Sequence, residues 1–301
     1  MRIGVVIGNP GGVGDSASSL ACDYERARAQ GLSTVWMTQH AGFDALTLMA
    51  SWGGHDGPEL GTAVIPVQTR HPIALAEQAI TTQTLTGGRL TLGLGLAHSA
   101  TLERFYGLSP RRSVKYLADY LDTLQALLAG TKSAFNETFR ISARIGADLP
   151  TPPPVLIAAL GPRMLQLAAE RTAGTITWAT GPRTIAEYIA PTIRAAAEAA
   201  DRANPRVVVC LPFCVTENRE QALNRLAQLA NYRDLPSYRA MLEREGVNDP
   251  RDIAIAGDAE TVREALDELR AAGATDVAAI PFGRSDEVAA TWEFLGACAR
   301  V

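Results

Sequence analysis

Short apolar runs alternate along this chain with longer segments in which apolar residues recur every three or four positions. The clearest example lies between residues 60 and 97, where the apolar run 61–66 precedes Pro72, a residue that suits the first position of a helix. Gly87 and Gly88 can end that helix in the left-handed conformation, and the apolar run 90–94 follows at once. Two parallel strands joined by one helix form a right-handed crossover, so this segment predicts such a unit.

The same alternation continues over the rest of the chain. We expect eight strands, at residues 3–7, 34–38, 61–65, 90–94, 155–159, 175–178, 207–213 and 276–280. We expect helices at residues 16–30, 44–51, 72–85, 113–128, 162–172, 182–201, 219–228, 260–272 and 286–299. Short, uniformly apolar strands are typical of a parallel sheet that helices cover. The pattern therefore predicts an α/β fold, a (β/α)8 TIM barrel that forms one domain over residues 1–301, with its active site at the carboxyl ends of the strands.

Two stretches interrupt the alternation. Residues 131–154 show little periodicity and end in a run of prolines, which predicts an irregular insertion before the fifth strand. Residues 232–257 form a longer excursion after the seventh strand, with a short helix expected around residues 238–245. Long loops on a barrel often form lids or subunit contacts, and a passive surface excursion is the alternative.

Composition narrows the class of protein. With 47% hydrophobic and 20% charged residues among 301, the chain can bury a sizeable core, and its net charge of −4 favours neither nucleic acid nor an anionic membrane as partner. It begins directly with a strand and has no apolar run of membrane length, so we expect a cytoplasmic location. The scattered cysteines are interpreted as buried thiols that act as small apolar residues: Cys22, Cys210, Cys214 and Cys298.

The residues that follow the predicted strands are mostly small or apolar, with many glycines and few acids. Among the histidines, His40 and His98 stand at strand ends. Hydrolases and metalloenzymes need clustered carboxylates and histidines, so we expect no metal site. Small apolar strand ends instead suit a flat aromatic cofactor, because the backbone can approach it closely.

Several of these segments resemble the luciferase-like monooxygenase superfamily: residues 36–40, 61–72 and 87–95. Others resemble more narrowly its branch of deazaflavin-dependent oxidoreductases: residues 177–183, 235–238 and 272–276. The resemblance spans nearly the whole chain. It implies a luciferase-like (β/α)8 barrel that binds reduced coenzyme F420 or a flavin noncovalently and assembles as a homodimer.

Residue by residue, the resemblance implies that Ala63 and Val64 form the family's non-prolyl cis peptide and brace the central ring of the cofactor; an ordinary trans strand end is the alternative. His40 matches a position where relatives often place a histidine beside an acid, here replaced by Gln39. His40 is then a catalytic residue that bonds the ring or relays a proton, although a purely structural histidine is equally open.

The Gly-rich end of the fourth strand is implied to meet the polar edge of the ring or the ribityl chain: Gly95, Leu96, Ala97 and His98. Pro162 can open a helix whose free N–H groups suit a phosphate, and Arg163 adds charge; a routine turn is the alternative. The further expected cofactor-binding residues are Ala158, Ala159, Leu160, Gly161, Pro162, Arg163 and Trp178.

The sequence thus predicts an oxidoreductase that moves a hydride between coenzyme F420 and a small organic substrate. An FMN-dependent monooxygenase on the same barrel is the first alternative. A barrel lyase or isomerase without redox cofactor would need a catalytic lysine or a carboxylate cluster at the strand ends, yet Lys115 lies on, and Lys132 beside, the fourth predicted helix. A noncatalytic cofactor carrier is the remaining possibility.

Overall fold

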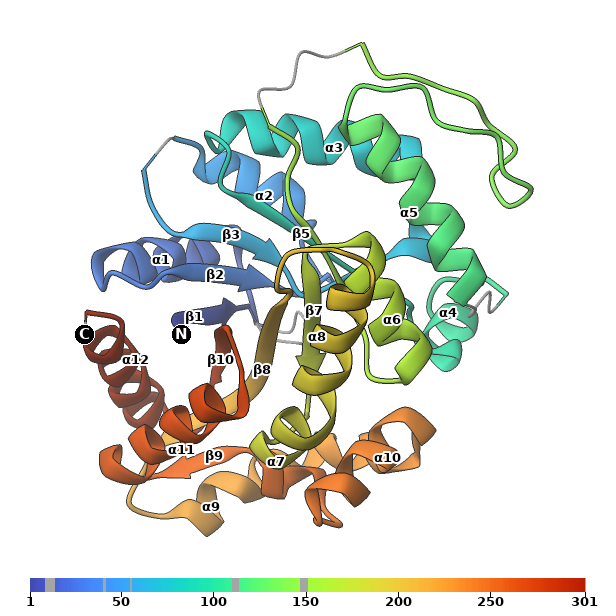
Figure 1. The fold of residues 1–301 in the computed structure, drawn as a ribbon. Helices are drawn as coiled ribbons and strands as arrows, with labels where there is room; N and C mark the ends of the chain where they lie inside the picture. The colour runs from blue at the N-terminus through green and yellow to red at the C-terminus, as the bar shows by residue number, and fades with distance from the viewer. Residues whose placement is uncertain (9–13, 40–41, 55, 110–113, 147–150, 301) are drawn as a thin grey trace. The chain divides into compact units, whose positions relative to one another are not determined.

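The computed structural model describes the chain except for residues 9–13, 40–41, 55, 110–113, 147–150 and 301. Strands and helices alternate through most of its length (Figure 1). The chain divides into two compact units. The first comprises Met1–Ile7, Cys22–Trp36 and Ala159–Val301, and the second comprises Gly8–Ala21 and Met37–Ala158. Helix α1 (Ala17–Ala29) and strand β2 (Thr34–Met37) contribute residues to both units.

The first unit is built on a parallel sheet around one long strand. Its strands besides β2 are β1 (Arg2–Ile7), β7 (Gly174–Trp178), β8 (Arg206–Val215), β9 (Ile255–Gly257) and β10 (Asp276–Pro281). Strand β8 pairs in parallel with β7, β9 and β10, and β10 pairs with β1. Residues 207–214 of β8 are all buried, which explains why this strand is apolar on both faces instead of alternating.

Helices follow the strands of the first unit. They are α6 (Pro162–Arg171), α7 (Pro182–Thr184), α8 (Ala190–Ala199), α9 (Arg219–Asn224), α10 (Pro236–Glu245), α11 (Ala259–Ala272) and α12 (Ser285–Ala299). At the amino end of β10, the fully buried Asp276 carboxylate pairs with Arg2 and with Arg206, whose Nη2 lies 2.7 Å away. This ion pair lies at the opposite end of the strands from the expected site, where its role is to stabilise the fold.

The strands of the second unit also pair in parallel. Strand β5 (Leu90–Gly95) pairs with β3 (Glu59–Thr62), β4 (Ile65–Pro66) and β6 (Val155–Ala158). Its helices are α2 (Ala45–Trp52), α3 (Pro72–Leu85), α4 (Ser99–Arg104) and α5 (Val114–Leu128), with a 3-10 turn at Val67–Thr69. Helix α3 begins at Pro72, as predicted, and the side chain of His71 caps it by accepting from the Ile73 N–H.

Each of the eight predicted strands is present, with small shifts of its ends, and the third is divided into β3 and β4 at residues 63–64. Among the α-helices and strands of the described residues, two were not predicted. One is helix α4. The other is strand β9, whose three residues carry too little periodicity to be recognised. The predicted helix 182–201 is divided by a π-helical turn at Ile185–Ile189. The helix expected around residues 238–245 is α10, which begins two residues earlier.

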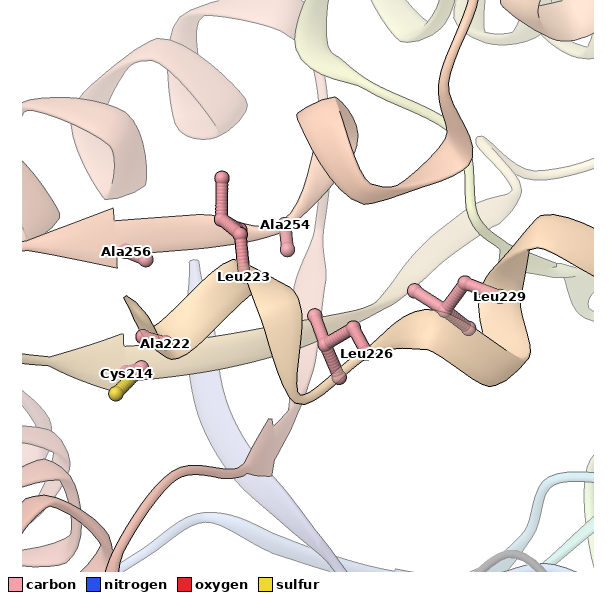
Figure 2. Close-up of a cluster of buried hydrophobic side chains, with 7 residues drawn as sticks. All are labelled: Cys214, Ala222, Leu223, Leu226, Leu229, Ala254 and Ala256. Atoms are coloured by element: carbon pink, nitrogen blue, oxygen red, sulfur yellow. The ribbon is translucent and has the colours of Figure 1, made fainter. Parts of the chain in front are cut away.

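The two stretches that break the alternation differ in structure. The described residues of 131–154 contain neither helix nor strand, in agreement with an irregular insertion. The excursion after β8 is more regular, because it holds the 3-10 segment η3 (Ala227–Asp234), α10, a 3-10 turn at Pro250–Ile253 and β9. A buried apolar cluster joins α9 and η3 to β8 and β9 (Figure 2): Cys214, Ala222, Leu223, Leu226, Leu229, Ala254 and Ala256.

The interpretation of the cysteines is correct for two of the four. Cys210 and Cys214 are buried, and burial raises the pKa of their thiols to about 12 and about 11. Cys22 is exposed and Cys298 is half-buried, so the prediction was wrong for these two. Cys22 lies in α1, which has too few apolar residues for the sequence to indicate which face of the helix is buried.

Candidate active site

Residues Ala63 and Val64 lie between β3 and β4, and the peptide bond that joins them is cis, as the resemblance implies. The Ala63 N–H donates to the carbonyl of Met37 over 2.7 Å, which ties this point to the end of β2. Both side chains are half-buried. The predicted backbone conformation is therefore confirmed, and the assignment of Ala63 and Val64 to cofactor binding stays a prediction.

Two glycines of β5 let the segment around Val64 pack closely on this strand. A Cβ atom at Gly93 would lie 1.9 Å from the carbonyl oxygen of Thr62, and one at Gly95 would lie 2.6 Å from Cγ2 of Val64. Thr62 also exchanges hydrogen bonds with the Gly93 backbone, at 2.7 and 2.8 Å. The Val64 side chain thus occupies the space that a β5 side chain would fill, with the Cβ of Ala158 3.3 Å from the same position.

The end of β5 is only partly available for a ligand. The Ala97 N–H already donates to Oε1 of Gln68 over 3.1 Å, so this backbone group is satisfied by the protein itself. Leu96, Ala97 and His98 are half-buried, and His98 is the residue before the first turn of α4. Gln68 was not identified from the sequence, because nothing local marks a glutamine whose partner lies 29 residues away.

Charged groups near the end of β2 are paired. Arg70 forms an ion pair with Asp44, and its Nη2 also donates to Oε1 of Gln39 over 3.1 Å. The Arg70 side chain is only 15% exposed. Arg70 lies within residues 61–72, one of the segments that carry the resemblance, but the resemblance implies no role for it. His40, the predicted catalytic residue, lies outside the described residues.

The first unit carries the predicted phosphate turn. Helix α6 begins at Pro162 after Gly161, with no side-chain cap, as predicted. The N–H groups of Met164 and Leu165 donate to the Gly161 carbonyl at 3.0 and 2.9 Å, so these two groups are already bonded within the turn. Arg163 is exposed, whereas Ala159 is buried and accepts from the Thr175 hydroxyl at 3.4 Å. The start of the helix at Pro162 is therefore confirmed, and its assignment as a phosphate site stays a prediction.

Trp178 ends β7 and packs against the cluster of Figure 2. Its ring meets Tyr232 of η3 edge to face, with centroids 5.9 Å apart, and Tyr232 in turn meets Tyr238 of α10 at 4.8 Å. Burial raises the pKa of Tyr232, so its hydroxyl stays protonated at neutral pH. The excursion thus packs against a predicted cofactor-binding residue, a contact that the sequence did not reveal.

The predicted site residues accordingly form two described groups. In the second unit, the side chains of Val64 and Ala158 both lie close to Gly95. In the first unit, residues 159–163 lead into α6, and Trp178 ends β7. Within the described part of the chain, no three His, Cys, Asp or Glu side chains are arranged to hold a metal ion. Val64, Gly95 and Ala158 form a small apolar shelf in the second unit, and such a surface suits the face of an aromatic ring.

Relatives of known name match large parts of the chain. A Mycobacterium tuberculosis protein named for coenzyme F420-dependent oxidoreductase activity is 29% identical over 54% of this chain and 51% of its own length. The 4-hydroxyprotoasukamycin monooxygenase of Streptomyces nodosus is 27% identical over 65% and 58%, so this chain spans little more than half the length of these two relatives. The 5,10-methylenetetrahydromethanopterin reductase of Methanolobus tindarius is 26% identical over 81% and 76%.

Solved structures match over almost the full length. The coenzyme F420-dependent tetrahydromethanopterin reductase of Methanopyrus kandleri superposes with a TM-score of 0.82 at 19% identity, covering 98% of this chain and 97% of that one. The monooxygenase RslO1 of Streptomyces bottropensis gives a TM-score of 0.78 at 19% identity, covering 99% and 98%. These matches confirm the predicted fold class, a (β/α)8 TIM barrel.

No helix in the described residues is both long and apolar enough to cross a bilayer.

The family model described as luciferase-like monooxygenase matches residues 1–276, which is most of the 301-residue chain. The chain therefore belongs to the luciferase-like monooxygenase family.

Proposed function

We propose that this protein is an oxidoreductase that binds coenzyme F420 noncovalently and moves a hydride between it and a small organic substrate. The observation that carries the proposal is the shelf made by Val64 over Gly95, where an apolar side chain takes the place of a β5 side chain at the carboxyl end of the strand. Reductases named for F420 among the relatives and solved structures support the choice of cofactor.

Different residues of the chain are proposed to contact the ring and the phosphate of the cofactor. Val64 supports a ring face by dispersion contacts, and the turn at Pro162 and Arg163 binds a phosphate through its N–H and guanidinium groups. When bound, the deazaflavin supplies the hydride chemistry itself. The apolar side chain of Val64 would exclude water from the ring face that it contacts, and His40 stays a prediction for the proton-handling group.

A titration of the purified protein tests the proposal. Coenzyme F420 and FMN are each titrated and followed by cofactor fluorescence, and we expect micromolar or tighter binding of F420. Binding of FMN alone would overturn the choice of cofactor, and binding of neither would overturn the function.

The phosphate turn has its own test in the variant Arg163→Gln. We expect it to weaken binding of F420 by about fivefold to tenfold, because one exposed charge-assisted contact is lost. Affinity for the phosphate-free deazariboflavin should not change. Arg171→Gln, at the other end of the same helix, is the matched control. An equal loss with the phosphate-free compound would contradict the assignment of this turn.

A flavin-dependent monooxygenase is the second candidate. It is favoured by the names of the Streptomyces relative and of a solved oxygenase in complex with FMN, which matches with a TM-score of 0.77 at 16% identity. Oxygen consumption that depends on reduced FMN and on an organic substrate would support it. The homodimer, the cytoplasmic location and the single domain over residues 1–301 remain predictions.

A further inference from the structure

The carboxamide of Gln39, just after β2, is held in one orientation. Its Oε1 accepts from the Ala45 N–H over 2.9 Å and from Nη2 of Arg70 over 3.1 Å. Only the oxygen of a carboxamide can accept two donors, so the assignment of oxygen and nitrogen is unambiguous. The NH2 group must then face away from Arg70, and it forms no hydrogen bond among the described residues.

Arg70 is itself fixed from several elements. Its guanidinium pairs with Asp44 and donates to Oε1 of Gln78 over 3.2 Å, while its carbonyl accepts from the Tyr120 hydroxyl over 3.0 Å. The Asp44 carboxylate also caps α2 by accepting from the Thr47 N–H over 2.8 Å. The N-cap residue of α2 and side chains from α3 and α5 therefore hold the arginine that bonds to Gln39.

Gln39 lies at the carboxyl end of its strand, close to the predicted ring-bracing residues. The carbonyl of Met37, two residues earlier, accepts from the Ala63 N–H over 2.7 Å. In barrels of this class the carboxyl ends of the strands carry the chemistry. The free NH2 group of Gln39 is thus a neutral hydrogen-bond donor on the segment that follows β2, whose last residue is bonded to the backbone of Ala63.

We propose that Nε2 of Gln39 donates a hydrogen bond to a carbonyl oxygen in the active site, and that Arg70 is the positioning residue that aims it. This inference rests on the proposed function. When a hydride from the reduced deazaflavin adds to a carbonyl carbon, the π electron pair moves to the oxygen, which then takes a proton from water. A fixed donor stabilises the charge that develops on that oxygen. The acceptor is either a carbonyl of the cofactor ring or the carbonyl of a ketone or quinone substrate.

Gln39→Glu is the decisive variant. A carboxylate still accepts from Ala45 and Arg70 but cannot donate. If Gln39 has a purely structural role, the affinity for F420 and the reduction of menadione should therefore be unchanged. Three quantities are measured: the urea midpoint of unfolding, the affinity for F420, and the reduction of menadione, a planar quinone, by reduced F420.

We expect an unfolding midpoint equal to or above that of the wild type. If the acceptor belongs to the cofactor, affinity for F420 falls by about tenfold. If the acceptor belongs to the substrate, that affinity is kept and kcat for menadione falls by about a hundredfold. Values of both quantities within twofold of the wild type would overturn the proposal. A wild-type protein that binds no cofactor would instead overturn the proposed function, and this inference with it.

The role of Arg70 is tested by non-additivity. Arg70→Lys keeps a positive charge beside Asp44, but one ammonium cannot reach Gln39 and Gln78 as the planar guanidinium does. We expect Arg70→Lys to lower the quantity that Gln39→Glu lowers. In a Gln39→Leu background, which lacks the donor, the same change should have no further effect. A full additional loss in that background would refute the positioning role.

Discussion

Replacing Gly95 with alanine tests the shelf that carries the proposed function. The new Cβ would lie 2.6 Å from Cγ2 of Val64 and 3.3 Å from the Cβ of Ala158. The first distance is far inside van der Waals contact, so Val64 or the backbone of β4 must move. Gly95 itself has no positive φ, so alanine meets no backbone strain there and the effect is one of packing alone.

The expected magnitude follows from those contacts. Overpacking of a well-filled position costs about 1–3 kcal/mol of unfolding free energy. Val64→Ala removes the clashing atom and leaves the Cβ of residue 64 at 3.7 Å, an ordinary contact, and the Ala158 Cβ at 3.3 Å, a slightly tight one. Since Val64 is half-buried, its truncation alone should cost about 1 kcal/mol. In the Val64→Ala background, Gly95→Ala should therefore cost less than about 0.5 kcal/mol, which gives a coupling energy of about 0.5–3 kcal/mol.

Urea unfolding of the wild type, both single variants and the double variant measures the coupling, and cofactor titration of the same proteins shows whether displacement of Val64 weakens binding. Gly93→Ala is the matched control, because its Cβ would lie 1.9 Å from a backbone oxygen, which no change at Val64 relieves. It should be more destabilising than Gly95→Ala and should not be rescued by Val64→Ala. A Gly95→Ala protein as stable as the wild type, or one that Val64→Ala fails to rescue, would refute the reasoning.

Two further predictions concern carboxylates of the first unit. The Glu245 carboxylate accepts from the Thr184 N–H at 2.7 Å and would lie 2.4 Å from a Cβ at Gly181. Gly181→Ala should therefore lower the free energy of unfolding, measured with urea, by about 1–3 kcal/mol, and by much less in a Glu245→Ala background. Equal costs in both backgrounds would contradict the contact. The Arg284 N–H, at 2.7 Å, and the Thr216 hydroxyl hold the pKa of the Glu287 carboxyl below its ordinary value of 4.5. A carboxyl group with a lowered pKa contributes stability above pH 4.5, and this stability is lost as the pH falls through the folded-state pKa. Glu287→Gln should therefore be less stable than the wild type by about 1–3 kcal/mol at neutral pH, and the difference should shrink below pH 4.5. A difference in unfolding free energy that stays constant with pH would argue against the assignment.

Local signals explain why most elements were predicted correctly. A helix start at Pro72 or Pro162 depends on residues within one turn, and an apolar strand such as β8 is recognisable because both of its faces are buried. Strand β9 escaped prediction because its three residues gain their conformation from pairing with β8, about 40 residues earlier in the chain. The predicted location of the cis peptide came from family resemblance, since no property of Ala63 or Val64 alone marks it.

The sequence by itself determined the alternation of strands and helices, the family and the strand ends at which chemistry is expected, because periodicity, proline and glycine act over a few residues. Only the tertiary structure decided which side chains meet there. Arg70 reaches Gln39 across 31 positions and Glu245 reaches Thr184 across 61, and neither pair leaves a mark in the local pattern. The physical reason is that hydrogen bonds and close contacts depend on distances in space, which the folded sheet fixes and the order of residues does not.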